Sequence, residues 1–121
     1  MKILVVDDSK AMRKIVIRTL RQAGFGDHTC LEAENGAIAL DMIGKESPNL
    51  VLCDWNMPEM NGEQCCQQAR AAGFAGTFGF ITTEGTPAMR QRANEAGANF
   101  LLAKPFTAEE LERVLNVHVG G

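Results

Sequence analysis

The sequence has no long run of apolar residues. The N-terminal run comprises only the four residues from Ile3 to Val6 before Asp7 interrupts it. A membrane-spanning helix needs about 20 apolar residues, and the apolar region of a signal peptide needs roughly 7 to 15. We therefore expect a cytoplasmic protein that does not insert into a membrane.

The chain also has no excess of basic residues. It contains 12 Lys or Arg and 15 Asp or Glu, with a formal net charge of -3 and a pI near 5.3. No run of Lys or Arg could follow the phosphates of a nucleic acid, so we expect no nucleic-acid partner. The length of 121 residues and the hydrophobic fraction of 45% are typical of one globular domain, which we place at residues 1–121.

The cysteines form neither a metal-binding motif nor a redox motif. None of them lies in a C-x-x-C pair or has a His at ligand spacing, which argues against a zinc site and a thioredoxin-like site. In a reducing compartment, free cysteines usually pack as small apolar residues. We therefore expect Cys30, Cys53, Cys65 and Cys66 to contribute to the core.

Two nucleotide-binding motifs are absent as well. The chain contains neither the G-x-x-x-x-G-K-[ST] loop of P-loop NTPases nor a G-x-G-x-x-G motif after the first apolar run. A flavodoxin-like electron carrier would need a hydroxyl-rich phosphate-binding loop where this chain has Asp7, Asp8 and Ser9. These absences argue against nucleotide and flavin chemistry.

What the sequence does contain is a regular alternation of strand and helix signals. The apolar runs are short and continuous, as expected for parallel strands that are buried on both faces. Alternation of this kind predicts right-handed crossovers with helices on both sides of one sheet, the doubly wound α/β class. The expected strands are Lys2 to Val6, Thr29 to Ala33, Val51 to Cys53, Thr77 to Ile81 and Asn99 to Ala103.

The expected helices are bounded by capping residues, glycines and prolines. The first runs from Ser9 to about Ala23, before Gly24 and Gly26, with Met12, Ile15, Val16, Thr19 and Leu20 at helical spacing. The second follows Asn35 and is closed by Gly44 and Pro48, with Ile38, Ala39, Met42 and Ile43 on one side. The others are Glu63 to Ala72, Pro87 to Ala96 between Thr86 and Gly97, and a helix that begins at Thr107 with a Glu110 capping box and Phe106 packed on Leu111.

Polar residues follow the expected strands at the point where each one ends. Asp7 and Asp8 follow the first strand, Asp54 the third, Thr82 the fourth and Lys104 the fifth. The carboxyl ends of parallel strands share one edge of the sheet, so these side chains should converge. Crowded carboxylates raise one another's pKa unless a cation neutralises them. Oxygen ligands of this kind suit Mg²⁺.

This set of groups predicts phosphoryl transfer to a carboxylate. Asp54, which lies in the stretch VLCDWNMPEMNG before a Pro58 and an Asn61-Gly62 turn, would become an aspartyl-phosphate. Mg²⁺ and Lys104 would offset the charge of the transferring group. Phosphorylation adds roughly -1.5 to -2 of charge. That charge could draw Thr82 and Lys104 inward and so change a surface of the protein.

Four motifs in order resemble those of the response-regulator receiver domain, and the resemblance covers the whole chain. They are Asp7-Asp8, Asp54 in DWNMP, Thr82-Thr83 and Lys104-Pro105-Phe106. The wording DWNMPEMNG and the single-domain length look most like the stand-alone receivers of chemotaxis. The resemblance implies a flavodoxin-like sheet with strand order 2-1-3-4-5.

The resemblance also implies a role for each residue of the site. Asp54 would accept phosphate from a histidine kinase. Asp8, Asp54 and the backbone carbonyl of Asn56 would bind Mg²⁺, and Asp7 would hold a metal-bound water. Lys104 would form a salt bridge with the phosphoryl group.

The other roles concern switching and the lifetime of the signal. The peptide bond before Pro105 is expected to be cis. Thr82, next to Thr83, would move toward the phosphate. Asn56 and Glu84 would tune dephosphorylation, so the protein would label and clear itself without being an enzyme that turns over an external substrate.

One position departs from the family pattern. The switch aromatic usually lies three residues before the Lys, and that place here is Leu101, with Phe100 one residue earlier. Side chains alternate across a strand, so Phe100 should face away from Leu101. Leu101 would then gate the same pocket by packing alone.

The output of a stand-alone receiver must pass through a protein partner. The resemblance places the partner surface on the fourth helix, fifth strand and fifth helix of a monomer, near Ala88 to Ala96, Phe100 to Leu102 and Thr107 to Val117. Control of chemotaxis or of a flagellar motor is the first interpretation. A phosphorelay shuttle, and a receiver excised from a larger regulator, remain alternatives.

An enzyme of a different class is also compatible with an aspartyl nucleophile. An aspartyl-nucleophile phosphatase would use a second acid two residues after the nucleophile as general acid and base. That place holds Asn56. The sequence therefore favours a receiver over a phosphatase.

Overall fold

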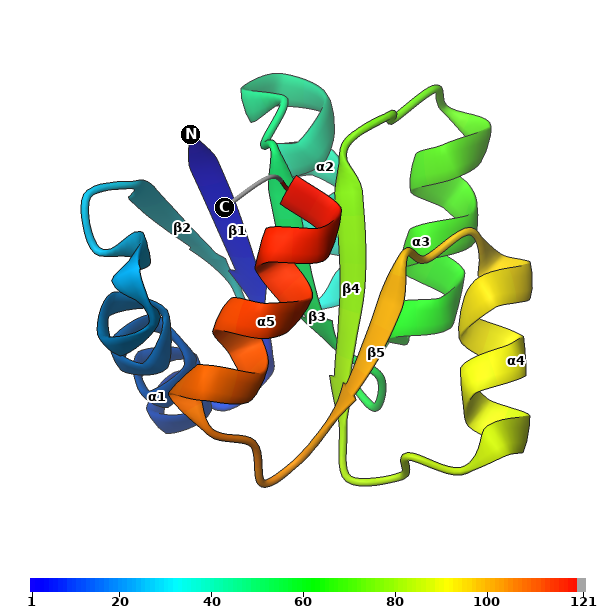
Figure 1. Ribbon diagram of the computed structural model, residues 1–121. Coiled ribbons are helices and arrows are strands. Elements are labelled where there is room, and N and C mark those ends of the chain that lie inside the picture. Colours follow the sequence, from blue (N-terminus) through cyan, green and yellow to red (C-terminus); the bar gives the residue numbers. More distant parts are fainter. Residues whose placement is uncertain (120–121) are drawn as a thin grey trace.

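The computed structural model of the protein describes residues 1–119, in which five strands alternate with five α-helices (Figure 1). The strands are β1 Lys2–Val6, β2 Thr29–Ala33, β3 Leu50–Asp54, β4 Thr77–Thr82 and β5 Phe100–Ala103. The α-helices are α1 Lys10–Leu20, α2 Gly36–Glu46, α3 Gly62–Ala71, α4 Pro87–Ala96 and α5 Ala108–Val119. A single π-helical turn, Arg21–Phe25, follows α1. Within the described residues, no helix has the length and apolar character needed to span a membrane.

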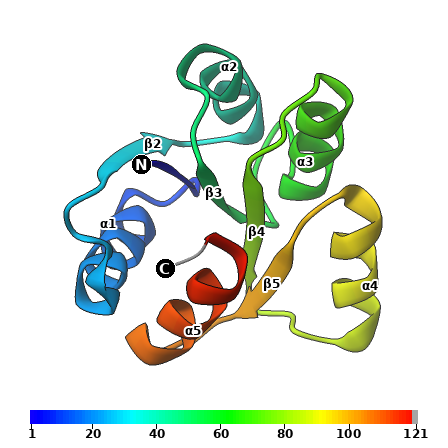
Figure 2. The ribbon, with the colours of Figure 1, turned by 45° about the horizontal axis from the view of Figure 1, so that its top comes forward.

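The strands form one parallel sheet in the order β2-β1-β3-β4-β5. Figure 2 shows α1 and α5 on one side of the sheet and α2, α3 and α4 on the other. The predicted doubly wound class and strand order are therefore confirmed. The chain reverses its direction of winding between β1 and β3, which is where ligands bind in open sheets of this kind.

Each face of the sheet has its own apolar core. In β1, Ile3 and Val5 pack in the cluster that contains residues of α1 and α5, whereas Leu4 and Val6 pack in the cluster under α2, α3 and α4. All four side chains are at most 1% exposed. Side chains alternate across a strand, so burial on both faces requires an unbroken apolar run. This requirement explains why the predicted strands are continuous apolar runs in the sequence.

Side-chain caps start the helices where the sequence predicts them. The side chain of Ser9 accepts a hydrogen bond from a backbone amide in the first turn of α1. The side chains of Asn35 and Thr86 do the same for α2 and α4. Thr107 and Glu110 form the predicted capping box, in which the Glu110 amide donates to Thr107 Oγ1 at 3.1 Å. Each such cap satisfies a backbone N–H that has no partner within the helix.

The prediction that Gly44 closes the second helix was wrong. The helix α2 continues through Gly44 to Glu46 and ends at Ser47, which has φ +48°. A glycine in a helix costs about 1 kcal/mol relative to alanine, and the packing of the other residues outweighs that cost. Pro48 follows directly and cannot continue the helix.

Two other boundaries also differ from the prediction. The first helix changes at Leu20 to the π-helical turn, and the chain leaves it through Gly24, whose φ of +96° favours glycine. Asn61, which was expected only in a turn, is the N-cap of α3 and forms a capping box with Gln64. Asn is a good residue for both purposes, and the Gln three residues later was the available signal.

Two helices bury fewer of their apolar side chains than their periodicity predicts. Ile15 in α1 is 45% exposed and Ile38 in α2 is 39% exposed, although both were expected on the apolar side. Val16, Leu20, Ala39 and Ile43 are buried as predicted. A helix that lies on a sheet buries only about a third of its circumference, so residues at the border of the stripe stay in solvent.

The cysteines lie mostly in the core, as expected. Cys53, Cys65 and Cys66 are fully buried in the cluster under α2, α3 and α4, and Cys30 is partly buried on the other face. They act as small apolar residues in these positions.

Candidate functional site

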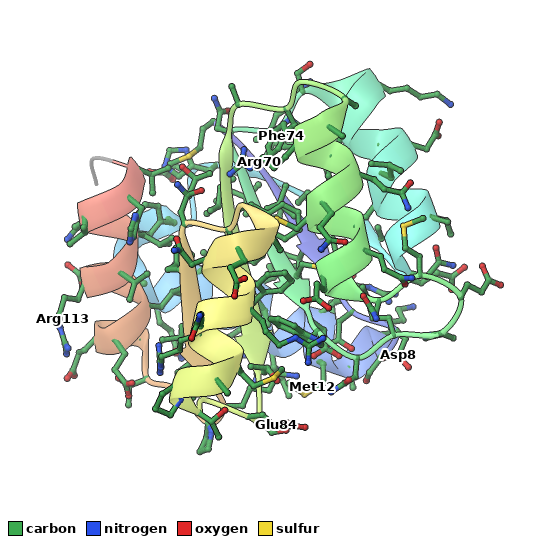
Figure 3. All side chains as sticks on the ribbon, turned by 90° about the vertical axis from the view of Figure 1, so that its right-hand side faces the viewer. Asp8, Met12, Arg70, Phe74, Glu84 and Arg113 are labelled. Carbon is green, nitrogen blue, oxygen red and sulfur yellow. The ribbon has the colours of Figure 1, made fainter. Side chains whose placement is uncertain are left out.

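The carboxyl ends of β1 and β3 bring three acids together at one edge of the sheet. Asp7 and Asp8 directly follow β1, and Asp54 is the last residue of β3. One carboxylate oxygen from each of the three lies within 4.8 Å of the others. Figure 3 shows Asp8 and Glu84 at this end of the molecule, while Arg70 and Phe74 lie at the opposite end. The predicted convergence of the acids is confirmed.

Lys104, which directly follows β5, brings a positive charge to the same place. Its Nζ lies 3.6 Å from Asp7 Oδ2 and 3.5 Å from Asp54 Oδ1. The side chains of Lys104, Asp7 and Asp54 are 18%, 6% and 14% exposed, so water screens these charges only in part. The amide of Lys104 also donates to the carbonyl of Thr82 at 2.7 Å, which fixes the Lys relative to β4. The Lys104–Pro105 peptide bond is cis.

One ammonium group does not balance three neighbouring carboxylates. Burial raises the pKa of Asp7 and of Asp54 above the usual value of 3.8, and Lys104 opposes this rise. The charge of Asp7 raises the pKa of Asp54 further. The cluster therefore favours an additional cation. Its clustered carboxylate oxygens, partly open to water, are the donor set that Mg²⁺ prefers, so the residues fit this ion.

Asp7 is held in place from three directions. Its amide donates to the Ala33 carbonyl at 3.1 Å, and its Oδ1 accepts from the Ser9 amide at 2.9 Å. Arg13 Nη1 donates to the Asp7 carbonyl at 2.6 Å, while Arg13 Nε donates to Glu32 at 3.0 Å. No local sequence pattern indicates the contact between Arg13 and Glu32, because it joins a helix to a strand 19 positions away.

Thr82 lies at the end of β4, and its side chain points to the interior. The residue is only 1% exposed, and its Oγ1 accepts a hydrogen bond from the Glu84 amide at 3.2 Å. Thr83, Glu84 and Asn56 are exposed at the same edge of the sheet. The hydroxyl of Thr82 keeps its own hydrogen available to a further acceptor.

Trp55 joins the site to the helices α3 and α4. It is 4% exposed, and its ring packs against Phe80 with centroids 4.5 Å apart. The guanidinium of Arg92 lies 5.5 Å from the centre of the Trp55 ring and forms two hydrogen bonds with Glu63, at 3.2 and 2.6 Å. Trp55 directly follows Asp54 in the chain, but no sequence pattern indicates its contact with α4.

Gly62 allows the chain to turn closely behind this site. A Cβ at this position would collide with the carbonyl of Asp54 and would also contact the ring of Phe80. The Gly62 amide donates to the Trp55 carbonyl at 2.8 Å. A side chain here would therefore displace the end of β3.

Leu101 and Phe100 face opposite sides of the sheet, as predicted. Leu101 is 6% exposed and packs in the cluster under α2, α3 and α4. Phe100 packs on the α5 side, where its ring stacks on His118 with centroids 5.2 Å apart. No aromatic side chain from β5 therefore lies under α4.

Comparison with known proteins identifies the class. The family model of the response regulator receiver domain matches residues 3–116. The chain belongs to the response-regulator receiver family, a family of signalling switches in two-component systems rather than of conventional enzymes.

Individual relatives are similar over nearly the whole chain. The chain is 42% identical to the chemotaxis protein CheY homolog of Campylobacter jejuni, covering 99% of this chain and 93% of the relative. It is 42% identical to the chemotaxis protein CheY1 of Helicobacter pylori, covering 99% and 98%. The solved structure of the Vibrio cholerae chemotaxis protein CheY4 has a TM-score of 0.85 and 32% identity over 97% of each chain. The chain is thus homologous to CheY proteins.

Proposed function

We propose that Asp54 is the phosphoacceptor of a two-component response regulator that acts in chemotaxis. The observation that carries this proposal is the convergence of Asp54 with two further acids and Lys104 at the end of β3. An oxygen of Asp54 would attack the phosphorus of a phosphohistidine on a histidine kinase. The bond from phosphorus to the imidazole nitrogen would break, and its electron pair would leave with the imidazole.

The resemblance to the receiver family suggests the metal-binding residues, and the clustering of Asp7, Asp8 and Asp54 supports this assignment. Asp8, Asp54 and the backbone carbonyl of Asn56 would hold Mg²⁺ directly, and Asp7 would hold it through a water. The bound ion supplies positive charge that offsets the charge of the transferring phosphoryl group. Lys104, already 3.5 Å from Asp54, would contribute a second positive charge to a phosphoryl oxygen.

The phosphoryl group would then act on Thr82. The free hydrogen of the Thr82 hydroxyl would be donated to a phosphoryl oxygen, which draws the end of β4 toward Asp54. Thr83 would lie beside the same group. Asn56 and Glu84, both exposed at the mouth of the site, would control the access of the water that removes the phosphoryl group.

The partner surface would consist of α4, β5 and α5. A change in the loop that follows Thr82 would reach α4 directly, and Leu101 is buried beneath this helix. A cytoplasmic protein target on this surface, with no nucleic acid or membrane involved, fits a monomeric switch. A phosphorelay shuttle would use the same site chemistry, with a histidine phosphotransfer protein as the partner.

The fluorescence of Trp55 tests the phosphoacceptor chemistry. Trp55 is the only tryptophan, it directly follows Asp54, and its buried ring should respond to changes at the site. We expect Mg²⁺ to change the emission and acetyl phosphate to change it further. Intact-mass analysis should show one phosphoryl adduct.

The control is Asp54→Asn, which lacks the nucleophilic oxygen. We expect this variant to show no response to acetyl phosphate and no adduct. Absence of an adduct on the native protein in the presence of Mg²⁺ would contradict the proposal and would favour the aspartyl-phosphatase alternative.

A further inference from the structure

Arg90 connects two segments that flank the switch residue. It lies on α4, and its Nε donates to the Gly85 carbonyl at 3.3 Å, while its Nη1 donates to the Leu101 carbonyl at 2.9 Å. Gly85 lies in the loop between β4 and α4, and Leu101 lies in β5. One planar guanidinium can bridge two carbonyls in this way, which a single ammonium group does much less well.

The same loop is also attached to Thr82, through the residue before Gly85. The Glu84 amide donates to Thr82 Oγ1 at 3.2 Å, and Gly85 is the next residue. A shift of the Thr82 side chain toward Asp54 therefore draws Glu84 and Gly85 in the same direction. The loop thus has one attachment to the switch residue and one to Arg90.

The two contacts of Arg90 are not equally able to follow such a shift. Leu101 pairs with Phe80 in the β4–β5 ladder and is 6% exposed, so its carbonyl is fixed by the sheet. Gly85 belongs to the loop, and its hydrogen bond to Arg90 is the longer of the two. Movement of the loop toward Asp54 would therefore break the contact with Gly85 and leave the contact with Leu101.

We propose that Arg90 is a positioning residue that holds the loop between β4 and α4 in its unphosphorylated arrangement and opposes the inward shift of Thr82. This inference rests on the proposed function. Arg90 connects the loop to β5 through its hydrogen bonds to the carbonyls of Gly85 and Leu101, in addition to the close packing of Gly85 on Ala103.

Linkage determines the direction of the effect. A contact that exists only in the unphosphorylated arrangement lowers the affinity for a phosphoryl group, since binding must break it. A contact that is kept in both arrangements, such as the one with Leu101, does not change this affinity, because it stabilises both arrangements equally. Removal of the Arg90 side chain should therefore strengthen the binding of a phosphoryl analogue.

The test uses Mg²⁺ and beryllofluoride, a non-covalent analogue of the phosphoryl group, with Trp55 fluorescence as the readout. We expect Arg90→Gln to bind beryllofluoride about three- to tenfold more tightly than the native protein, the range for one partly exposed hydrogen bond. The affinity for Mg²⁺ alone should not change. Amide exchange at Glu84 should be faster in the variant before beryllofluoride is added.

Two further variants separate bridging from charge. Arg90→Lys keeps the charge but loses the bridge between the two carbonyls, so it should behave like Arg90→Gln. Arg113→Gln removes an exposed Arg of α5, which Figure 3 shows pointing away from the protein, and it should behave like the native protein. Equal beryllofluoride affinity of Arg90→Gln and the native protein would overturn the inference alone, whereas no binding by the native protein would overturn the proposed function with it.

Discussion

The charges of individual residues dominate the behaviour of this site. Asp54 has to remain ionised in order to act as a nucleophile, yet burial and Asp7 raise its pKa. Lys104 is the residue that opposes this effect, with Nζ at 3.5 and 3.6 Å from the two acids. The same ammonium group also repels any cation that binds to these carboxylates. Lys104 should therefore have opposite effects on metal binding and on phosphorylation.

Substitution of Lys104 separates these two effects. We expect Lys104→Gln to bind Mg²⁺ about tenfold more tightly, because a positive charge 3.5 Å from Asp54 Oδ1 has been removed. Phosphorylation by acetyl phosphate should become slower, since the phosphoryl group has lost a cation that stabilises its charge. A fluorescence titration with Mg²⁺ and a time course of the mass adduct measure the two quantities.

A remote lysine provides the control for this experiment. Lys45→Gln removes an exposed Lys from α2, where it pairs with Asp41, and it should change neither quantity. Weaker Mg²⁺ binding in Lys104→Gln would contradict the electrostatic account and indicate that Lys104 is needed to shape the site.

At the scale of elements, three charged side chains join α1 to β2 behind the site. Glu32 of β2 accepts hydrogen bonds from Arg13 and Lys14 of α1, at 3.0 and 2.8 Å. Lys14 and Arg13 lower the pKa of Glu32 below 4.5. Since Arg13 also donates to the Asp7 carbonyl, this contact fixes the position of α1 relative to the end of β1.

The lowered pKa predicts a dependence of stability on pH. A carboxyl group with a lowered pKa in the folded state stabilises the protein above its unfolded pKa, and this stabilisation is lost as the pH falls through the folded value. We expect Glu32→Gln to lower the free energy of unfolding at pH 7 by about 1 kcal/mol, as for a partly exposed pair. Urea unfolding should show the difference between the variant and the native protein shrinking below pH 4.5.

Glu34 offers a matched control for that measurement. It is an exposed acid two positions after Glu32, so Glu34→Gln should leave stability nearly unchanged both at pH 7 and below pH 4.5. A difference between Glu32→Gln and the native protein that persists unchanged at pH 3 would show that the loss comes from packing and not from charge.

The sequence predicts these elements well where a local signal determines them. Continuous apolar runs predicted the strands, because burial on both faces requires them, and the caps at Ser9 and Asn35 predicted two helix starts. The acids and Lys104 were predicted to converge because parallel strands end at one edge. Long-range side-chain contacts had no such signal. The hydrogen bonds of Arg13 and Arg90 to backbone carbonyls depend on how the helices lie on the sheet. The sequence alone does not distinguish these two residues from the other Arg residues.

Over the whole molecule, one edge of the sheet carries a concentration of negative charge that the fold stabilises only in part. The cores on the two faces determine the positions of β1 and β3, and these strands bring the acids within 4.8 Å of one another. Folding without a cation therefore has an electrostatic cost. The stability of the whole protein should report the occupation of the site.

Thermal and urea unfolding at several pH values test this relation. The pKa of Asp7 and of Asp54 is raised above 3.8, so the folded state binds more protons than the unfolded state between 3.8 and the raised values. The stability contributed by these two groups therefore falls as the pH rises through that window.

At pH 7, Mg²⁺ at ten times its dissociation constant should raise the free energy of unfolding by about 1.4 kcal/mol. Asp54→Asn should raise the metal-free stability by about 1 kcal/mol, because one partly buried charge of the cluster is gone, and it should gain less from Mg²⁺. Equal stabilisation of both proteins by Mg²⁺ would show that the ion binds elsewhere and that Asp54 is not one of its ligands.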